Sequence, residues 1–333
     1  MAKGDRVNII SKCMAILCAL LLLLAAELLL RVYHQQTLRQ KLPTELREET
    51  RLLTWGEIKD KYRIVCLGDS ITYGEDLPYA ETYPVVLGRL LKQKYADLDV
   101  VVINSGVRGH TSVQGLARLE RDVLWYKPHV VFIAFGLNDA RLGYWPLDPI
   151  RERQMRGDPS LPGRVAALLQ CSHLWLTLRA RTRRLLRHLG WQEKAPEMPV
   201  GGEPQPRMSR EGFAMAQERL VEGIQKNGCQ AVFLMTATPV TERFAGQLGP
   251  AWQQRQLSLY EEYNRIIREI AAKHGVYLLD LHAIFAHHEA EFPLLLAEDG
   301  VHLTAAGEHL VAQSALYALE ACGLPGSERY RRR

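Results

Sequence analysis

One stretch decides the fold of this chain of 333 residues: RIVCLGDSITYG, residues 63–74. It begins as a short apolar run rich in branched side chains, the pattern of a strand buried in a parallel sheet. The run ends at Gly68-Asp69-Ser70, where glycine allows a sharp turn. Such a turn leaves the Ser70 hydroxyl at the carboxyl end of the strand, where open α/β sheets bind their ligands. Ser70 is therefore a candidate nucleophile, and it needs a base and donors for an oxyanion.

Further apolar runs predict that this strand belongs to a larger sheet. We expect strands at 63–67, 100–103, 129–135, 231–235 and 276–280. We expect helices at 81–95, at 209–227 and at 257–274, another capped by Ser112, and a last one capped by Thr304 that ends at Ala321. Strands that alternate with helices indicate a parallel sheet with right-handed crossovers. The polar segments that follow the strands then lie at one edge of the sheet.

Three of these polar segments offer partners for Ser70. Gly109 lies in the turn after the second strand, where its backbone N–H can face the site, and Asn138 follows the third strand and can donate its amide. Asp299 precedes His302 by three residues, a spacing that lets a carboxylate orient an imidazole. Each signal alone also fits an ordinary turn, cap or surface pair. Their coincidence at one edge predicts a nucleophilic site.

Together these segments resemble the four sequence blocks of the SGNH, or GDSL, hydrolase family. The blocks are GDSI at 68–71, RGHTS at 108–112, GLND at 136–139 and DGVH at 299–302, with Ile71 where the family name has leucine. The resemblance covers residues 62–139 and 209–322. It implies an α/β fold, namely a flavodoxin-like three-layer sandwich whose parallel five-stranded sheet has the order 2-1-3-4-5.

The resemblance also implies a role for each site residue. Ser70 would be the nucleophile, His302 the base and Asp299 its orienter, with the backbone N–H groups of Ser70 and Gly109 and the Asn138 amide as oxyanion donors. We therefore expect a serine esterase that works through an acyl-enzyme on a lipid or an acylated carbohydrate. The alternatives are an O-acyltransferase or deacetylase of an envelope polysaccharide, and a non-catalytic binding module of the same fold.

We expect neither a metal nor another cofactor. The six cysteines are scattered, without a CxxC pair or a metal-ligand spacing. The net charge of +5 is mild, and we expect no nucleic-acid partner.

Residues 1–45 are predicted to anchor the chain in a membrane. The segment from Cys13 to Leu30 is apolar except for Glu27. About 18 residues at a rise of about 1.5 Å nearly cross the hydrocarbon layer. The alternative is a cleaved signal peptide followed by secretion, for which Leu24-Ala25-Ala26 would be a poor cleavage site.

A single anchor of this kind predicts a single-pass protein with its catalytic domain outside the cytoplasm. We expect that domain to span residues 46–322, with a polar linker from Pro43 to Lys61 before the first strand. Residues 323–333 would form a basic tail.

Residues 140–208 interrupt the alternation of strands and helices, so we expect an insertion after the third strand. Within it, residues 173–191 predict an amphipathic helix, and its basic face carries Arg179, Arg183, Arg184 and Arg187. Such a face can contact an anionic membrane surface or polymer, and a cap helix with a solvated face is the alternative. Because the insertion leaves the sheet at its carboxyl edge, we expect its ends near Ser70 and hypothesise that it covers the site and selects the substrate.

Overall fold

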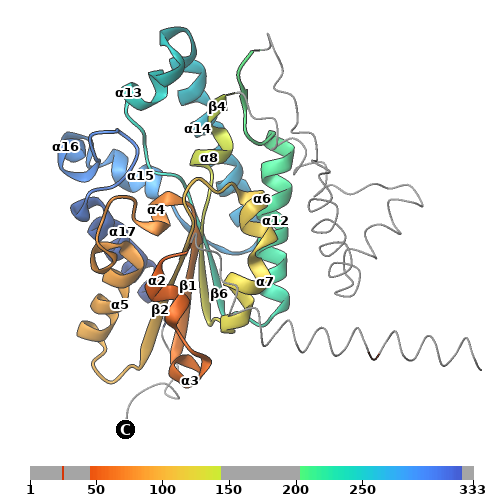
Figure 1. Ribbon diagram of the computed structural model, residues 1–333, viewed down its shortest axis with the longest axis vertical. Coiled ribbons are helices and arrows are strands. Elements are labelled where there is room, and N and C mark those ends of the chain that lie inside the picture. Colours follow the sequence, from red (N-terminus) through yellow and green to blue (C-terminus); the bar gives the residue numbers. More distant parts are fainter. Residues whose placement is uncertain (1–24, 26–45, 144–202, 325–333) are drawn as a thin grey trace, which may run out of the picture. The chain divides into compact units, whose positions relative to one another are not determined.

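The computed structural model describes residue 25 and residues 46–143 and 203–324 (Figure 1). From residue 46 onward, these residues belong to one compact unit of the chain, 43–155 with 197–333. The predicted anchor, the basic helix with Arg179, Arg183, Arg184 and Arg187, most of the insertion and nearly all of the tail lie outside the described residues. In the part that is described, no helix is long and apolar enough to span a membrane.

A parallel sheet forms the centre of this unit. Its strands are β1 (Tyr62–Gly68), β2 (Val100–Gly106), β3 (Val130–Ala134), β6 (Ala231–Met235) and β7 (Tyr277–Leu279). The five strands lie in the order β2-β1-β3-β6-β7, which is 2-1-3-4-5 when they are counted along the chain. All neighbouring strands are parallel. The predicted α/β class with a five-stranded parallel sheet is confirmed, and its topological switch point lies between β1 and β3.

The strands are buried because helices cover both faces of the sheet (Figure 1). Every residue of β1 is buried, which is why residues 64–67 form a continuous apolar run rather than an alternating one. Between β3 and β6, Phe132 stacks on Phe233 with ring centroids 4.7 Å apart. The core therefore fixes the register of the strands whose ends carry the site.

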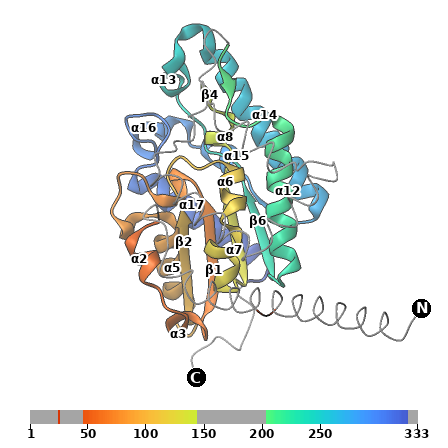
Figure 2. The ribbon, with the colours of Figure 1, turned by 45° about the vertical axis from the view of Figure 1, so that its right-hand side comes forward.

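The longer helices form the two outer layers. On one face α5 (Tyr83–Lys94) packs against α17 (Ala305–Ala321). The other face carries α6 (Ser112–Ala117), α7 (Leu119–Asp122), α12 (Arg210–Lys226) and α14 (Pro250–His274). Figure 2 shows α12 beside α14 on this face. The predicted cap Thr304 is present, since its side chain accepts a hydrogen bond from Gly307 N at the start of α17. Ser209, expected inside the helix, is instead the N-cap of α12 and accepts a hydrogen bond from Gly212 N.

Shorter helices complete the unit. They are α2 (Glu48–Leu52), α3 (Trp55–Ile58), α4 (Ser70–Tyr73), α8 (Leu137–Ala140), α13 (Glu242–Ala245), α15 (Leu281–Ala286) and α16 (Phe292–Leu295), with 3-10 turns η1 (Tyr79–Glu81), η2 (Leu124–Tyr126), η3 (Gly246–Leu248) and η4 (Glu289–Glu291). Helices α4, α8 and α15 lie at one end of the sheet (Figure 1), and each follows the carboxyl end of a strand.

The expectation of a polar linker before β1 is wrong for the described residues. The segment forms α2 and α3, and the side chains of Thr50 and Ile58 are fully buried. The Thr50 hydroxyl donates to the carbonyl of Asn104, 2.8 Å away, at the end of β2. Arg47 donates to the carbonyls of Gly74 (2.6 Å) and Leu77 (2.7 Å) in the loop after α4. The segment is therefore part of the domain, held by contacts to residues far away in the sequence.

Two helix boundaries also differ from the prediction. Thr111 rather than Ser112 is the N-cap of α6, and that helix ends at Ala117. The buried guanidinium of Arg118 donates to the Gly68 carbonyl, 2.7 Å away, at the point where the helical pattern breaks. Helix α14 begins at Pro250 rather than at residue 257, because proline is well suited to the first turn of a helix.

The two described ends of the insertion meet in a short pair of strands that the sequence did not predict. Strand β4 (Leu142–Gly143) runs antiparallel to β5 (Gln205–Pro206). Buried Gln256 of α14 accepts a hydrogen bond from Leu142 N (2.7 Å) and donates to the Ala140 carbonyl (3.0 Å). We call residues 141–143 and 205–208 the neck of the insertion.

Candidate active site

The turn after β1 presents Ser70 at the first position of α4. Asp69 is the N-cap of this helix, and its carboxylate accepts a hydrogen bond from Ile71 N at 3.0 Å. A Cβ at Gly68 would lie 2.9 Å from the Ala134 carbonyl oxygen and would overlap Thr72. Glycine is therefore required for the strand to turn into the helix so closely beside β3.

The structure brings His302 and Asp299 to this serine. His302 Nε2 lies 2.9 Å from Ser70 Oγ, and His302 Nδ1 is hydrogen-bonded to Asp299 Oδ2. The other oxygen of Asp299 accepts the backbone N–H groups of Val301 and His302, each at 3.0 Å. Three residues predicted from two segments far apart in the sequence are thus connected in one chain of hydrogen bonds.

Local hydrogen bonds favour the ionised form of Asp299. Partial burial acts to raise the pKa of Asp299, but hydrogen bonds from Val301 and from the backbone and ring of His302 outweigh it and hold the pKa below its usual value. An ionised carboxylate keeps the proton of the imidazole on Nδ1. The arrangement therefore leaves Nε2 able to accept a proton from Ser70.

The other two predicted oxyanion donors, Gly109 and Asn138, line the same cleft as Ser70 and His302. Gly109 adopts a left-handed conformation, with φ 68°, in the turn after β2. Asn138 lies in α8 after β3, and its Nδ2 donates to Asp69 Oδ2 at 3.2 Å. One amide hydrogen is used in that bond, and the amide has a second hydrogen to donate to a substrate.

The cleft is open and has a volume of about 210 Å³. It is lined by Ser70, Glu75, Arg108, Gly109, Leu137, Asn138, Arg141, Phe244, Val301 and His302. Arg108 and Arg141 were not predicted as site residues. The available signal was their position in the chain, because Arg108 precedes Gly109 and Arg141 follows Asn138 by three residues.

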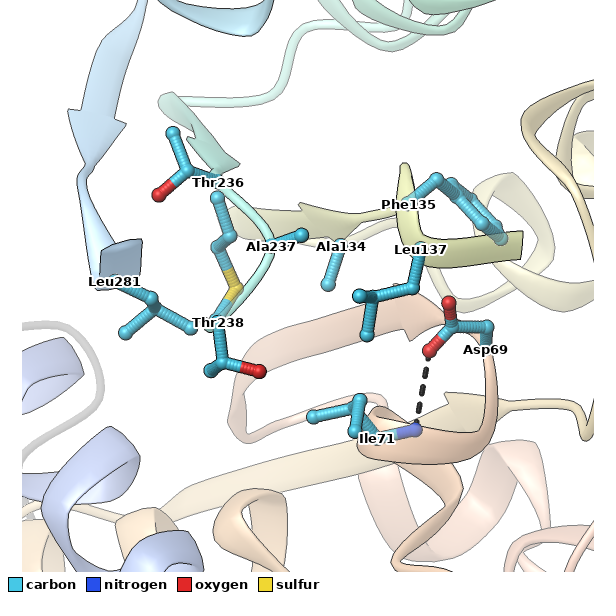
Figure 3. Close-up of a pocket in the computed structure, with 10 residues that line it drawn as sticks. Asp69, Ile71, Ala134, Phe135, Leu137, Thr236, Ala237, Thr238 and Leu281 are labelled. Carbon is cyan, nitrogen blue, oxygen red and sulfur yellow. Dashed lines mark hydrogen bonds between the residues drawn. The ribbon is translucent and has the colours of Figure 1, made fainter. Parts of the chain in front are cut away.

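A second, smaller cavity lies on the buried side of the nucleophile turn. Figure 3 shows Ile71, Leu137 and Thr238 among the residues that line it. Its volume of about 20 Å³ is enough for one water molecule. The Thr238 hydroxyl is buried without a hydrogen-bond partner in the described part of the chain. This cavity is too small for an ester, so the larger cleft is the candidate substrate site.

Two buried carboxyl groups support the walls of the site. Burial raises the pKa of Asp69 to about 6 and that of Asp139 to about 7. Asp139 in α8 accepts hydrogen bonds from Ser112 N (2.9 Å) and Ser112 Oγ (2.6 Å) at the start of α6. From the sequence, Asp69 was expected only as part of the turn, and no role was expected for Asp139. The structure shows that they connect the segments that carry Ser70, Gly109 and Asn138.

The far end of the insertion also contacts the site. Arg207 in the neck donates from Nη1 to the Gly109 carbonyl, 2.8 Å away. Its backbone N–H donates to the Arg141 carbonyl at 3.2 Å. One end of the insertion therefore lines the cleft through Arg141, and the other end holds the turn that carries Gly109.

Two histidines outside the cleft have close carboxylate neighbours. His282 Nε2 lies 2.8 Å from Glu261, and His288 Nδ1 lies 3.0 Å from Glu291. Within residues 46–143 and 203–324, no group of three or more His, Cys, Asp or Glu side chains could hold a metal ion.

The protein therefore belongs to the class of α/β proteins that carry a Ser–His–Asp arrangement at the switch point of a parallel sheet. The chain belongs to the GDSL-like lipase/acylhydrolase family, whose model matches residues 66–310.

Several similar proteins carry names of esterases. An arylesterase of Vibrio mimicus is 34% identical over 84 residues, which are 25% of this chain and 41% of that protein. An acetylxylan esterase of Geobacillus stearothermophilus is 36% identical over 87 residues, 23% of this chain and 40% of that protein. The matched part of the chain thus spans about two fifths of the length of these relatives.

The likeness to solved structures extends over the whole fold. The crystal structure of a lipase/acylhydrolase from Enterococcus faecalis superposes with a TM-score of 0.50 at 20% identity, covering 78% of this chain and 96% of that one. At this identity the likeness shows the fold.

Proposed function

We propose that this protein is a serine esterase that hydrolyses an ester through an acyl-enzyme on Ser70. The observation that carries the proposal is the 2.9 Å hydrogen bond between His302 Nε2 and Ser70 Oγ, with Asp299 bound to the opposite ring nitrogen. Membership of the family and relatives named arylesterase and acetylxylan esterase support ester hydrolysis. The substrate class we propose is a lipid or an acylated carbohydrate.

The proposed reaction has two halves that share one base. His302 takes the Ser70 proton as Oγ attacks the carbonyl carbon, and Asp299 stabilises the imidazolium. The N–H groups of Ser70 and Gly109 and the second amide hydrogen of Asn138 would stabilise the oxyanion, at about 2.7–4 kcal/mol for each donor. Collapse of the intermediate transfers the His302 proton to the departing alcohol. Water, deprotonated by His302, then attacks the acyl-enzyme; as the acid leaves, His302 returns this proton to Ser70 Oγ.

A fluorophosphonate probe tests the nucleophile. Wild-type protein should be labelled, Ser70→Ala should abolish labelling, and His302→Ala should reduce it strongly. Ser314 in α17, which donates to the Leu310 carbonyl away from the cleft, provides a matched control, because Ser314→Ala should be labelled like wild type. Equal labelling of wild type and Ser70→Ala would remove Ser70 as the nucleophile.

The same acyl-enzyme could be intercepted by a sugar hydroxyl, which would make the protein an O-acyltransferase. A labelled acceptor sugar distinguishes the two reactions, since transfer acylates the sugar whereas hydrolysis releases free acid. A protein that is neither labelled nor active on a panel of p-nitrophenyl esters would be a binding module.

We further propose that residues 13–30 anchor the chain, with the catalytic domain outside the cytoplasm. The proposal depends on the apolar run between Cys13 and Leu30. The full chain should remain in membranes after an alkaline carbonate wash, and the domain should be digested by protease added outside intact cells. A mature chain that starts near Glu27 would identify a cleaved signal peptide instead.

The basic face of the insertion is proposed to contact an anionic membrane surface. Changing Arg179, Arg183, Arg184 and Arg187 to Glu should weaken the binding of anchor-free protein to anionic vesicles, with a difference that shrinks at high salt. Equal binding would favour a solvated cap helix.

The neck gives the boundaries for testing whether the insertion selects the substrate. Replacing residues 144–204 by a short Gly/Ser turn joins Gly143 to Gln205, which already pair in the neck. Hydrolysis of a small acetyl ester should persist, while activity on larger esters should fall. An unchanged preference among esters would exclude a role in selection.

A further inference from the structure

We propose that the side chain of Leu137 ends the acyl subsite of the cleft, so that the preferred ester carries a short acyl group such as acetyl. This inference rests on the proposed esterase function, because it takes the Ser70 cleft as the substrate site. It narrows the substrate class toward short-chain esters, such as an acetylated carbohydrate, and away from esters of long-chain fatty acids.

Leu137 lies between the cleft and the small cavity behind the nucleophile turn. Among the described residues, it is the one that lines both spaces. Figure 3 shows its side chain pointing into the small cavity near Asp69 and Ile71, the two neighbours of Ser70 in the chain. Leu137 is only 7% exposed. Its isobutyl group therefore separates the two spaces.

The small cavity has a mainly apolar lining. Besides Leu137, the apolar residues around it are Ile71, Ala134, Phe135, Met235, Ala237 and Leu281. Its volume of about 20 Å³ leaves room for no more than one small group. An alkyl chain could bury apolar surface here only if the group that separates the cavity from the cleft were smaller.

The cleft has an apolar part and a polar part. Among the described residues, the apolar side chains that line it belong to Leu137, Phe244 and Val301. Another part of its lining is an ion pair, with Arg108 Nε 2.8 Å from Glu75 Oε2. An acyl chain is apolar and gains nothing by covering an ion pair. The acyl chain is therefore best accommodated along the apolar part.

The oxyanion donors bring the acyl group close to Leu137. In the proposed reaction the ester carbonyl lies at Ser70 with its oxygen toward the amide of Asn138, and Leu137 directly precedes Asn138 in α8. The first carbons of the acyl chain then meet the Leu137 side chain. A longer chain has to turn away from it toward solvent, where its added methylene groups are not buried.

The backbone of α8 is held, so Leu137 keeps its place when a ligand enters. Asp139 accepts a hydrogen bond from Ser112 Oγ at 2.6 Å, and the Ala140 carbonyl accepts one from buried Gln256 at 3.0 Å. These contacts tie the short helix to α6 and α14. Leu137 is therefore a fixed end to the acyl subsite.

The test compares p-nitrophenyl hexanoate with p-nitrophenyl acetate on the full chain, at one concentration of neutral detergent. The two esters share the leaving group and the reacting carbonyl, so the ratio of kcat/KM for hexanoate to kcat/KM for acetate reports the acyl chain. In wild type this ratio should be at most about one, because the added methylene groups find no apolar surface beyond Leu137. A wild-type ratio well above one would overturn the proposal.

Leu137→Ala opens the cleft into the small cavity. Each methylene group moved into apolar surroundings contributes about fourfold, so the ratio should rise at least about tenfold. The matched control is Leu281→Ala, which deletes the same group from a buried side chain that lines the small cavity but not the cleft. Its ratio should equal that of wild type. Both variants lose stability, but a ratio of two rates does not depend on the folded fraction.

Two results would overturn the assignment of Leu137. The ratio could be the same in Leu137→Ala as in wild type, or it could rise equally in Leu281→Ala. The first result would mean that the acyl chain does not meet Leu137, and the second that loss of packing alone changes the preference.

Failure of the esterase function gives a different result. Wild-type protein that cleaves neither ester would contradict the proposed hydrolysis. Calorimetric titration with hexanamide, which carries the same chain on an unreactive carbonyl, then tests Leu137 alone. Leu137→Ala should bind this probe at least about tenfold more tightly than wild type and Leu281→Ala do, and equal affinity would overturn the inference.

Discussion

The two segments that meet at the Ser70–His302 hydrogen bond are held by different means. The Ser70 turn is packed into the sheet domain, where Asp69 and Thr72 are buried and a Cβ at Gly68 or Gly106 would clash with neighbouring atoms. The His302 segment is more open. It is tied down by an isolated bridge between residues 296 and 303 and by the hydrogen bonds of Asp299, whose side chain is 42% exposed. The nucleophile is thus positioned by the core, and the base by local hydrogen bonds.

The carboxyl groups on the two sides show the same contrast. Burial raises the pKa of Asp69 and Asp139, whereas hydrogen bonds overcome partial burial to lower the pKa of Asp299. Substitutions in the Ser70 turn should therefore lower both stability and activity. Substitutions in the His302 segment should lower activity and leave stability nearly unchanged.

The largest effect is expected for Asp299→Asn. An amide can still accept the backbone N–H groups at Oδ1, but it favours the wrong imidazole tautomer, so kcat should fall about 10⁴-fold. The free energy of unfolding should change by less than about 1 kcal/mol, as is usual for an exposed site. Steady-state kinetics and urea unfolding measure the two quantities. A large loss of stability would contradict the division drawn between the two segments.

The next effect is expected for Gly106→Ala, because the added methyl group would overlap the backbone at Tyr73. We expect a loss of about 3 kcal/mol in the free energy of unfolding, accompanied by a loss of activity. The control is Gly275→Ala, where φ is 62° and no heavy atom lies within 4 Å of the added carbon. It should cost only about 1 kcal/mol, through the left-handed conformation. Equal losses in urea unfolding would show that packing does not fix the nucleophile turn.

A smaller effect is expected at the neck, which contacts the Ser70 side of the site through Gly109. Arg207→Ala removes the hydrogen bond to the Gly109 carbonyl and should lower kcat about tenfold with little change in KM, as expected when a donor to the oxyanion loses its support. Arg207→Lys should restore part of kcat. Arg210→Ala, which breaks an exposed ion pair with Glu262, is the control and should keep wild-type kcat. A change confined to KM would assign Arg207 to substrate binding instead.

The smallest effect is a change in pH dependence. Because the folded-state pKa of Asp139 is raised to about 7, the folded protein binds this proton more tightly than the unfolded chain does between about pH 4 and pH 7. The stability contributed by the protonated group is present at low pH and is lost as pH rises through that window. Asp299 acts in the opposite sense, because its pKa is lowered in the folded state.

Asp139→Asn removes the first contribution. The stability of the variant relative to wild type should therefore rise between about pH 4.5 and pH 7.5, by an amount on the order of 1 kcal/mol. Urea unfolding at both pH values gives this difference. A difference that is the same at both pH values would mean that Asp139 does not change its protonation on folding.

Much of the fold could be predicted because a buried parallel strand has a continuous apolar run in its sequence. Strand β6 lies at residues 231–235, as predicted, and the first, third and fifth strands differ from their predicted ends by one residue at each end. The segments that carry Ser70, Asn138 and Asp299 could be selected because polar residues follow apolar runs at one edge of such a sheet.

The remaining features depend on contacts that leave no local pattern. Helices α2 and α3 were missed because the burial of Thr50 depends on Asn104, 54 residues away. Arg207 lies 98 residues from the carbonyl that it binds. Arginine in a polar segment is usually solvated, so only the folded structure distinguishes Arg207 from the other basic residues of the insertion.

The two-residue ladder between β4 and β5 makes this position of the fold open to change over evolutionary time. Because Gly143 and Gln205 already lie side by side, the chain between them can lengthen, shorten or be exchanged without rebuilding the sheet. The entropic cost of closing a longer excursion grows slowly, by about 0.6 kcal/mol for each doubling in length. A segment inserted at this point would therefore be held by the β4–β5 pair near Ser70 from the start. For protein engineering, the same ladder is a grafting point at which a foreign binding module could be brought next to the catalytic serine.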